Sequence, residues 1–452
     1  MSSYGTTRVS GLPGGVSAQD TIVAWAIRSC AAPIAFLMSS SGKKALLIIA
    51  LLNIPFQVGG PLWQDDTLSA YGAISSFVLT LTAPAVFGLY IREFLCETLD
   101  RTASFTTRPR WRFSMSLTIY LVLMIVSLAV AERPSLSLFQ IWLFVQNYLL
   151  FLYIANRTES QKAALFIIKW LLIGLFLNGL AALVLNVIGH TFHVTGFYAQ
   201  TQESETLSRV GLPGAPNLAA SYLSMTMSLT LGVLMSNLQG WPKRLALVAV
   251  VVGGLHLLLT FSRGGWLEFL ISGLIIGFVA FHRGWISLRL PVMALVIAAV
   301  VALPLYSNIA TRLSADDEGS AASRVPLNGI AFRMIAEHPL FGVGANNFTV
   351  RLPEYVTTYN VGDYIGAVHN TYLLIWSETG LLALLSFLAF LGATIRTAWR
   401  CCLSSDRFNS PIALAIFGAT IGFTVHMTVD KFAEGMDTYW VLAGLIFALY
   451  KS

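Results

Sequence analysis

The sequence predicts an all-α polytopic membrane protein with about twelve transmembrane helices and a long, partly helical loop before the helices near its end. Hydrophobic residues make up 56% of the chain and charged residues only 11%, whereas soluble domains average roughly 45–50% and about 25%. The mean hydropathy is +0.71, and apolar runs recur along the whole chain. This composition excludes an ordinary soluble enzyme, a disordered chain and a nucleic-acid-binding module, so no nucleic acid is expected as a partner.

The expected spans are apolar runs bounded by polar residues, proline or glycine, as a bilayer core requires. They cover residues 45–58, 68–91, 114–131, 136–154, 163–188, 218–236, 244–260, 265–281, 291–306, 370–391, 411–428 and 438–450. The chain therefore divides into an N-terminal cytoplasmic or interfacial segment, a transmembrane bundle, a periplasmic loop region and the last spans with the C-terminus, at residues 1–44, 45–306, 307–368 and 369–452.

The segment before the first span has an ambiguous character. Residues 21–38 are apolar but contain Arg28 and Pro33, and a central arginine in a spanning helix costs about 2.5–3.5 kcal/mol on insertion scales. An interfacial helix is favoured, because it keeps both termini inside, while a thirteenth span or a re-entrant hairpin are the alternatives. Residues 1–20 are polar and rich in Gly and Ser, so no cleavable signal peptide is expected.

Charge distribution predicts the orientation of the bundle. The formal net charge is +6, and basic residues concentrate in cytoplasmic loops of membrane proteins. When Lys43 and Lys44 are placed inside and the spans alternate, most Lys and Arg residues fall inside. The long connections 189–217 and 307–369 then lie outside. Within the second, residues 325–339 read as a short amphipathic helix closed by Pro339.

Polar residues at the predicted outer end of the bundle suggest an anion site. Arg263 lies between two apolar spans and is followed by Gly264, which permits close approach of the backbone. Its planar guanidinium matches a phosphate group, and Arg209 and Arg333 could join it to hold a diphosphate. The alternative interpretation is an interfacial arginine whose side chain extends to lipid headgroups. Membrane lipids are expected partners in either case.

His369 begins an apolar helix at the same predicted outer end. Tyr372 and Trp376 follow on one face of this helix. An imidazole with an ordinary pKa near 6.5 can accept a proton at neutral pH, which suits a general base acting on a sugar hydroxyl. The alternative is a histidine that merely hydrogen-bonds at a helix start. Glu378 faces away from His369, so it is expected to contact another helix, and Glu268 is a second polar residue within a span.

Motifs for metal or nucleotide chemistry are absent from the sequence. His190 and His193 are spaced i,i+3 but have no further ligand types nearby, so no metal site is expected. The chain contains no P-loop and no Asp-x-Asp triplet. No cofactor is therefore expected.

Four segments taken together resemble the bacterial O-antigen ligase and O-antigen polymerase superfamily over about residues 205–395. They are an Arg before a Gly/Pro/Asn patch, a Ser-Arg-Gly turn, a Pro-Leu-Phe-Gly-Val-Gly stretch and a His-Asn…Glu-Thr-Gly helix, at residues 208–217, 260–266, 338–348 and 368–380. Each motif is weak alone, but their order before and after a long outer loop is fairly specific.

The resemblance implies an inverting, metal-independent glycosyltransferase at the periplasmic face of the bacterial inner membrane. The donor would be a glycan on undecaprenyl diphosphate, and the acceptor a hydroxyl of lipid A–core oligosaccharide. His369 matches the essential histidine, Arg209 and Arg263 match the diphosphate-binding arginines, and Arg333 is a weaker match. The motifs also place four supporting residues around them, namely Asn217, Asn370, Tyr372 and Glu378.

Three alternatives stay open. The first is a polysaccharide polymerase, whose acceptor is a second lipid-linked repeat. The second is a transporter of a lipid-linked sugar, which would be expected to carry polar sites near the middle of the membrane, whereas the candidates here cluster at one end. The third is a structural membrane scaffold, which would not need His369 in any particular protonation state.

Overall fold

The computed structural model describes most of the chain, and it is a bundle of helices with three short hairpins. The described residues are 34–64, 74, 76–99, 111–188, 193–194, 197–198, 200–203, 208–212, 214–314, 324–356, 366–432 and 437–451. The first helices are α2 Ser40–Asn53, α3 Thr82–Leu99, α4 Met115–Ser127, α5 Pro134–Arg157, α6 Gln161–Ile188, α7 Pro216–Met235, α8 Trp241–Leu259 and α9 Arg263–His282. The remaining ones are α10 Arg289–Ala302, α11 Tyr306–Ser314, α12 Arg324–Glu337, α13 Phe348–Tyr355, α14 Thr371–Thr379, α15 Leu381–Cys402, α16 Asn409–His426 and α17 Asp437–Leu449, with a 3-10 turn at Leu303–Leu305.

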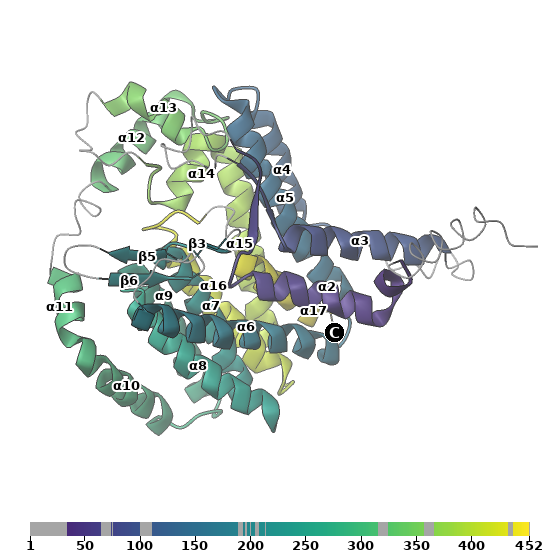
Figure 1. The fold of residues 1–452 in the computed structure, drawn as a ribbon, viewed down its shortest axis with the longest axis vertical. Helices are drawn as coiled ribbons and strands as arrows, with labels where there is room; N and C mark the ends of the chain where they lie inside the picture. Colours follow the sequence, from purple (N-terminus) through teal and green to yellow (C-terminus); the bar gives the residue numbers. More distant parts are fainter. Residues whose placement is uncertain are drawn as a thin grey trace, which may run out of the picture.

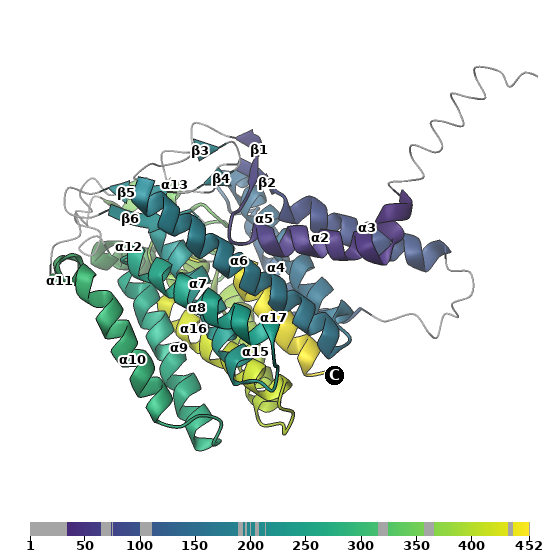
Figure 2. The same ribbon diagram turned by 60° about the horizontal axis from the view of Figure 1, so that its bottom comes forward.

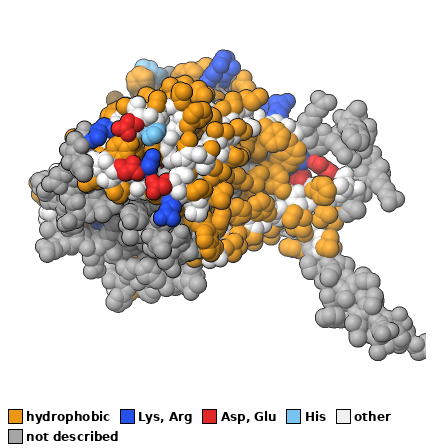
Figure 3. Space-filling view, turned by 90° about the horizontal axis from the view of Figure 1, so that it is seen from above, with side chains coloured by type: hydrophobic (Ala, Val, Ile, Leu, Met, Phe, Trp, Pro, Cys, Tyr) orange, Lys and Arg blue, Asp and Glu red, His pale blue; other side chains and the backbone are white. Residues whose placement is uncertain are grey.

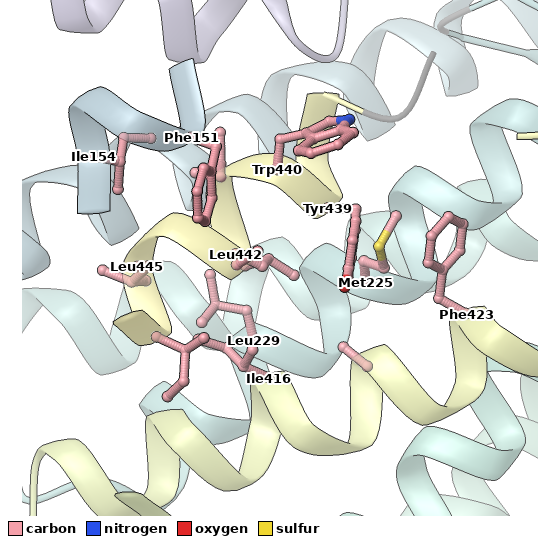
Figure 4. Packing of buried hydrophobic residues seen from close by; sticks show 14 of the residues in the cluster. Phe151, Ile154, Met225, Leu229, Ile416, Phe423, Tyr439, Trp440, Leu442 and Leu445 are labelled. Carbon is pink, nitrogen blue, oxygen red and sulfur yellow. The ribbon is translucent and has the colours of Figure 1, made fainter. Parts of the chain in front are cut away.

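The core lies among helices that are far apart in the sequence. α16 packs against α7, α9 and α15, and α17 packs against α5, as the ribbon in Figure 1 shows. Trp440 on α17 lies against Phe390 on α15 with ring centroids 5.6 Å apart, and against Phe144 on α5 at 5.5 Å. Figure 4 shows Trp440 in this core, with Phe151 of α5 near it and Met225 of α7 and Phe423 of α16 toward one side. Aromatic rings therefore tie the early and late helices into one bundle.

The fold confirms an all-α polytopic membrane protein. Six described helices are long and apolar enough to cross a bilayer, namely α5, α6, α7, α8, α9 and α15, and α4 and α17 are shorter apolar helices. Many large hydrophobic side chains are exposed on them, including Leu274 and Phe278 of α9. In the view of Figure 3, charged side chains gather on one part of the face, while much of the remaining described surface is hydrophobic. Such a surface requires lipid rather than water as its solvent.

Two expected spans differ from the structure. The span expected at 370–391 is divided at Gly380, which has a φ of +88°, into α14 and the start of α15. Residues 76–80 of the predicted span 68–91 form strand β2 (Ser76–Thr80), which pairs antiparallel with β1 (Gly59–Gln64). Helix α3 begins only at Thr82 and continues to Leu99. Phe77 on β2 packs edge-on against Phe139 of α5 with centroids 4.6 Å apart. The β1–β2 hairpin thus covers the start of α5. The apolar run at 68–91 did not predict this hairpin.

The connection between α10 and α14 is partly helical, as predicted. It contains α11, α12 and α13, and a helix is present before Pro339 as predicted, since α12 ends at Glu337. Figure 2 shows α10 extending beside α9, with α11 and α12 near the same end of the bundle as the β5–β6 hairpin. The predicted interfacial helix at 21–38 lies mostly outside the described residues.

Short hairpins occupy the other long connection. β5 (Gln200–Glu203) pairs with β6 (Ser208–Gly211), and β3 (His193–Val194) pairs with β4 (Phe197–Tyr198). Strand β6 contacts α6, α7 and α8. Val210 and Leu212 are buried in a small apolar cluster with Ala182 and Leu185 of α6. This burial holds the strand that carries Arg209 against the end of the bundle.

Candidate active site

A polar cleft lies where several helices begin. Its volume is about 50 Å³, and it is lined by Arg209, Asn217, Ser262, Arg263, Gly264, Arg324, His426, Val429 and Asp430. These residues come from β6, the first turns of α7, α9 and α12, and the end of α16 with the loop that follows it. The cleft therefore assembles two of the predicted arginines from segments that are separate in the sequence.

Arg209 is held in place by two neighbouring elements. Its Nε donates to the carbonyl oxygen of Thr260 at 2.9 Å, and one terminal nitrogen donates to Oδ1 of Asn217 at 2.9 Å. Asn217 lies in the first turn of α7, which begins with Pro216. These bonds restrict the guanidinium before any ligand arrives, so less side-chain entropy is lost on binding.

Arg263 is the first residue of helix α9. The hydroxyl of Ser262 caps this helix by accepting from the amide of Gly265 at 3.2 Å. A Cβ at Gly265 would lie 2.3 Å from the Cβ of Ala220, so glycine at this position lets α9 approach α7 closely. The approach brings Arg263 and Asn217 to the same cleft. The dipole of the helix start adds to the positive potential there.

His369 and Asp430 form a hydrogen-bonded pair beside the cleft. Nδ1 of His369 lies 3.0 Å from Oδ1 of Asp430, and their side chains are 14% and 8% exposed. A carboxylate at Nδ1 places the hydrogen on that nitrogen, which leaves Nε2 as the basic one. Asp430 itself lines the cleft. His369 is not among the residues that line it and is joined to it through Asp430.

The backbone around Asp430 is fixed by the start of α14. The hydroxyl of Thr371 donates to the carbonyl oxygen of Asp430 at 2.8 Å and accepts from the amide of Phe432 at 3.0 Å. The amide of Lys431 donates to Oδ1 of Asp430 at 2.8 Å. Burial alone would raise the pKa of Asp430, but the hydrogen bond and charge of His369 outweigh burial, so this pKa lies below its ordinary value. Burial also lowers the pKa of Lys431, against the opposing effect of Asp430.

The supporting residues on α14 orient its start. The side chain of Asn370 caps the helix by accepting from the amides of Tyr372 and Leu373 at 3.0 and 3.1 Å. The Tyr372 hydroxyl donates to the carbonyl oxygen of Thr424 on α16 at 2.8 Å. α14 is therefore attached to α16, whose end leads to Asp430. Both residues act on the position of His369 rather than on the cleft.

Glu378 contacts another segment, as predicted. Its Oε1 accepts from the amide of Phe348 at 3.1 Å, and its carbonyl oxygen accepts from the amide of Gly344 at 2.8 Å. Gly342 has a φ of +66°, and a Cβ there would lie 2.3 Å from the carbonyl carbon of Glu378. The Pro-Leu-Phe-Gly stretch is thus packed on the end of α14, where it supports the helix that His369 precedes.

Arg333 is not among the residues that line the cleft. Its guanidinium lies over the ring of Tyr355 at 5.5 Å from the centroid. Tyr355 in turn donates to Oε2 of Glu337 at 2.6 Å. Arg324, at the start of the same helix α12, lines the cleft instead. The long connection does supply a cation to the cleft, but from the first residue of α12.

Sequence reasoning missed three residues at this site, namely Arg324, His426 and Asp430. Nothing local in the sequence indicates where the helix that begins at Arg324 lies relative to the bundle. Asp430 lies 61 residues after His369, and no spacing rule connects the two. The one available signal was the position of Asp430 at the predicted outer end of the span 411–428, which also contains His426.

The charges at the cleft suit a negatively charged ligand. Three arginines face a space bordered by helix starts, and a diphosphate is recognised by converging guanidinium groups and backbone amides. His190, from the candidate metal pair, lies outside the described residues, and the side chain of His193 is not described. Within the described part of the chain no group of three or more His, Cys, Asp and Glu residues is arranged to hold a metal ion.

Comparison with known proteins adds an independent observation. Residues 222–388 match the family model described as Wzy_C, O-antigen ligase; this range includes Arg263 and His369. The O-antigen ligase of Salmonella typhimurium is 27% identical over 217 residues, which cover 44% of this chain and 52% of that protein. The match thus spans about half the length of this curated relative.

A solved structure is also similar in part. Its title describes the coordination of polymerization and crosslinking by a peptidoglycan synthase complex. The identity is 15%, the TM-score is 0.40, and the similarity covers 74% of this chain and 95% of that one.

Proposed function

Because the chain belongs to the O-antigen ligase superfamily, we propose that it transfers a glycan from undecaprenyl diphosphate to a hydroxyl of lipid A–core oligosaccharide. At the level of the superfamily it is a glycosyltransferase-type membrane enzyme. The proposal further places it in the bacterial inner membrane with the cleft facing the periplasm. The single observation that carries the proposal is the convergence of Arg209, Arg263 and Asp430 at one cleft, with His369 bonded to Asp430 beside it.

In the proposed reaction the acceptor hydroxyl attacks the anomeric carbon of the donor sugar. The bond from that carbon to the diphosphate oxygen breaks, and its electron pair stays on the oxygen. Arg209 and Arg263 stabilise the negative charge that develops there. Nε2 of His369 takes the proton of the attacking hydroxyl, while Asp430 accepts the Nδ1 hydrogen bond and stabilises the imidazolium that forms. A single displacement of this kind inverts the anomeric configuration.

All the predicted site residues except Arg333 have a proposed role in this scheme. Asn217 fixes Arg209, Asn370 and Tyr372 position the start of α14, and Glu378 supports its end. Arg324 is a third cation at the cleft. Arg333 stays a prediction for the loop region, because its guanidinium lies over Tyr355 rather than at the cleft.

The decisive experiment offers the purified full chain a lipid-linked glycan together with two acceptors. One is lipid A–core oligosaccharide, and the other is further lipid-linked repeat. Sugar gained by lipid A–core supports the ligase, and sugar gained by the second repeat identifies a polymerase instead. A His369→Ala variant should remain folded and membrane-inserted but lose about 10²–10⁴-fold in transfer rate, and near-normal transfer by this variant would remove His369 from the role of base.

The scheme needs no metal ion for the chemical step, since arginines provide the positive charge. Transfer by the purified chain should therefore continue in the presence of EDTA. A sharp loss that added Mg²⁺ or Mn²⁺ restores would overturn this part of the proposal.

A further inference from the structure

A second histidine–carboxylate pair lies at the cleft, on α16 and α9. Nδ1 of His426, at the end of α16, lies 2.6 Å from Oε2 of Glu268 on α9, and their side chains are 1% and 0% exposed. The ring of His426 also packs edge-on against Phe432 with centroids 4.7 Å apart. The glutamate and the phenylalanine hold the ring in a single orientation.

The other ring nitrogen of His426 points at the start of α9. A Cβ added to Gly264 would lie 2.4 Å from this Nε2 atom, so the absence of a side chain at Gly264 makes room for the ring. His426 lines the cleft with Arg263, and the hydrogen bond of its ring to Glu268 uses Nδ1 rather than Nε2. A polar atom of an almost fully buried ring is therefore directed at the first turn of a 20-residue helix.

The surrounding charges favour a proton on this ring when an anion is present. Glu268 contacts Nδ1, and a buried carboxylate is stabilised by an imidazolium partner. The other charged groups that face the ring across the cleft are Arg263 on α9, Arg209 on β6 and Arg324 on α12. Asp430 is in the loop after α16, with Lys431 next to it and His369 beyond it. The three arginines oppose the proton on His426 until a bound anion neutralises them.

We propose that His426, oriented by Glu268, is a further ligand for the diphosphate of the donor and donates a hydrogen bond from Nε2 when the ring is protonated. The inference rests on the proposed function and names a residue that binds the same anion as Arg263. Protonation of His426 and binding of the diphosphate then favour each other, because each stabilises the other through one hydrogen bond and opposite charges. Donor affinity should fall as the ring loses its proton.

The test measures binding of a short-chain polyprenyl diphosphate glucose to the full chain in nanodiscs. Each phosphate of this diester carries one charge throughout the range from about pH 5.5 to about pH 8.5, so any pH dependence comes from the protein. We expect wild-type affinity to fall about tenfold across this range, which is the effect of a coupling of one pKa unit. The control His282→Gln, at the far end of α9, should show the same fall.

Two variants isolate His426. The double variant Glu268→Gln with His426→Gln keeps a neutral pair that can still hydrogen-bond and removes both titrating groups. Its affinity should be independent of pH and close to the wild-type value at high pH. In Glu268→Gln alone the imidazolium loses its carboxylate, so the pH at which affinity falls should move lower. A thermal unfolding midpoint near that of wild type verifies that each variant is folded.

The outcomes separate this inference from the proposed function. If the double variant keeps the wild-type pH dependence, His426 is not a ligand of the diphosphate. The proposed function can still hold in that case, because loss of binding in Arg263→Ala would support the cleft as the donor site. If donor affinity falls at the same pH in Glu268→Gln as in wild type, the coupling of Glu268 to His426 is overturned. If the wild-type chain does not bind the probe at all, both this inference and the proposed donor site fail.

Discussion

Nδ1 of His369 lies 3.0 Å from Oδ1 of Asp430, although 61 residues separate them in the chain. The contact depends on α14 and α16 being joined at their ends. Thr371 bonds to the carbonyl oxygen of Asp430, and Tyr372 bonds to that of Thr424. The pair is therefore a product of helix packing, and it links the proposed base to the cleft that holds the arginines.

Asp430→Asn should lower the transfer rate by at least about tenfold, because the amide no longer stabilises the imidazolium and can favour the wrong tautomer. The acid limb of the pH–rate profile should move to lower pH, since protonation of His369 becomes less favourable. Steady-state transfer rates from about pH 5 to about pH 9 provide the measurement. An unchanged profile would show that Asp430 does not act through His369.

The same aspartate predicts a pH dependence of stability. Its pKa is lower in the folded chain than its ordinary value of about 3.9. The carboxylate therefore contributes to the free energy of unfolding at pH values above that ordinary value, and the contribution is lost as pH falls through the lowered pKa. The difference between the unfolding midpoints of wild type and Asp430→Asn should be largest above about pH 4 and should shrink steadily as pH falls below it. A difference that does not shrink with falling pH would contradict the assignment.

Arg263→Lys should reduce turnover well below wild type even though the charge is retained. A lysine ammonium lacks the planar fork that can contact two phosphate oxygens together. Comparison of kcat and KM for the lipid-linked donor measures the effect. The matched control is Arg351→Lys. Arg351 pairs with Glu132 and Glu354 on the surface, so this variant should leave both kcat and KM near their wild-type values. Equal turnover in the two variants would reject a diphosphate clamp at Arg263.

Gly264→Ala should reduce transfer strongly. The added Cβ would lie 2.4 Å from Nε2 and 2.6 Å from Cδ2 of His426, so the ring or the start of α9 must move away from the cleft. The control Gly273→Ala lies on the same helix with nothing within 4 Å of its added Cβ. The control should be neutral or stabilising by up to about 1 kcal/mol from helix propensity. The transfer rate and the thermal unfolding midpoint of both variants provide the measurement. Equal values for Gly264→Ala and Gly273→Ala would mean that the close approach of Gly264 to His426 is unimportant for transfer.

Thr371→Val should destabilise the loop that carries Asp430. The valine has a similar shape but cannot accept from the buried amide of Phe432 or donate to the carbonyl oxygen of Asp430. A buried polar group left without its bond costs about 1–3 kcal/mol. Thr420→Val is the control, because its hydroxyl bonds only to Ile416 within α16. A lower unfolding midpoint and slower transfer are expected for Thr371→Val relative to this control.

Much of the fold could be predicted from apolar runs because membrane helices satisfy their backbone bonds internally. The spans at 136–154, 163–188 and 218–236 correspond to α5, α6 and α7 with shifted ends. The span expected at 68–91 was wrong in its first part, where β2 forms. This strand pairs with β1, the strand before it, and packs against Phe139 of α5. A strand held by such tertiary contacts is not predicted by an apolar run alone.

The candidate site was predictable only in part for a related reason. Arg209, Arg263 and His369 lie in short motifs with recognisable local chemistry. Asp430 and His426 became site candidates only once α16 was placed beside α9 and α14.

The sequence by itself determined that this protein resides in a membrane, where its helices lie approximately, and which cations and imidazole are available for chemistry. Those properties follow from composition and from the order of residues within short segments, and they do not depend on which segments pack together. Only the tertiary structure decided which carboxylate orients His369, that Arg324 rather than Arg333 reaches the cleft, and that His426 faces Gly264. Each of these depends on how helices far apart in the chain pack, and close packing is decided by the shapes of side chains on both partners.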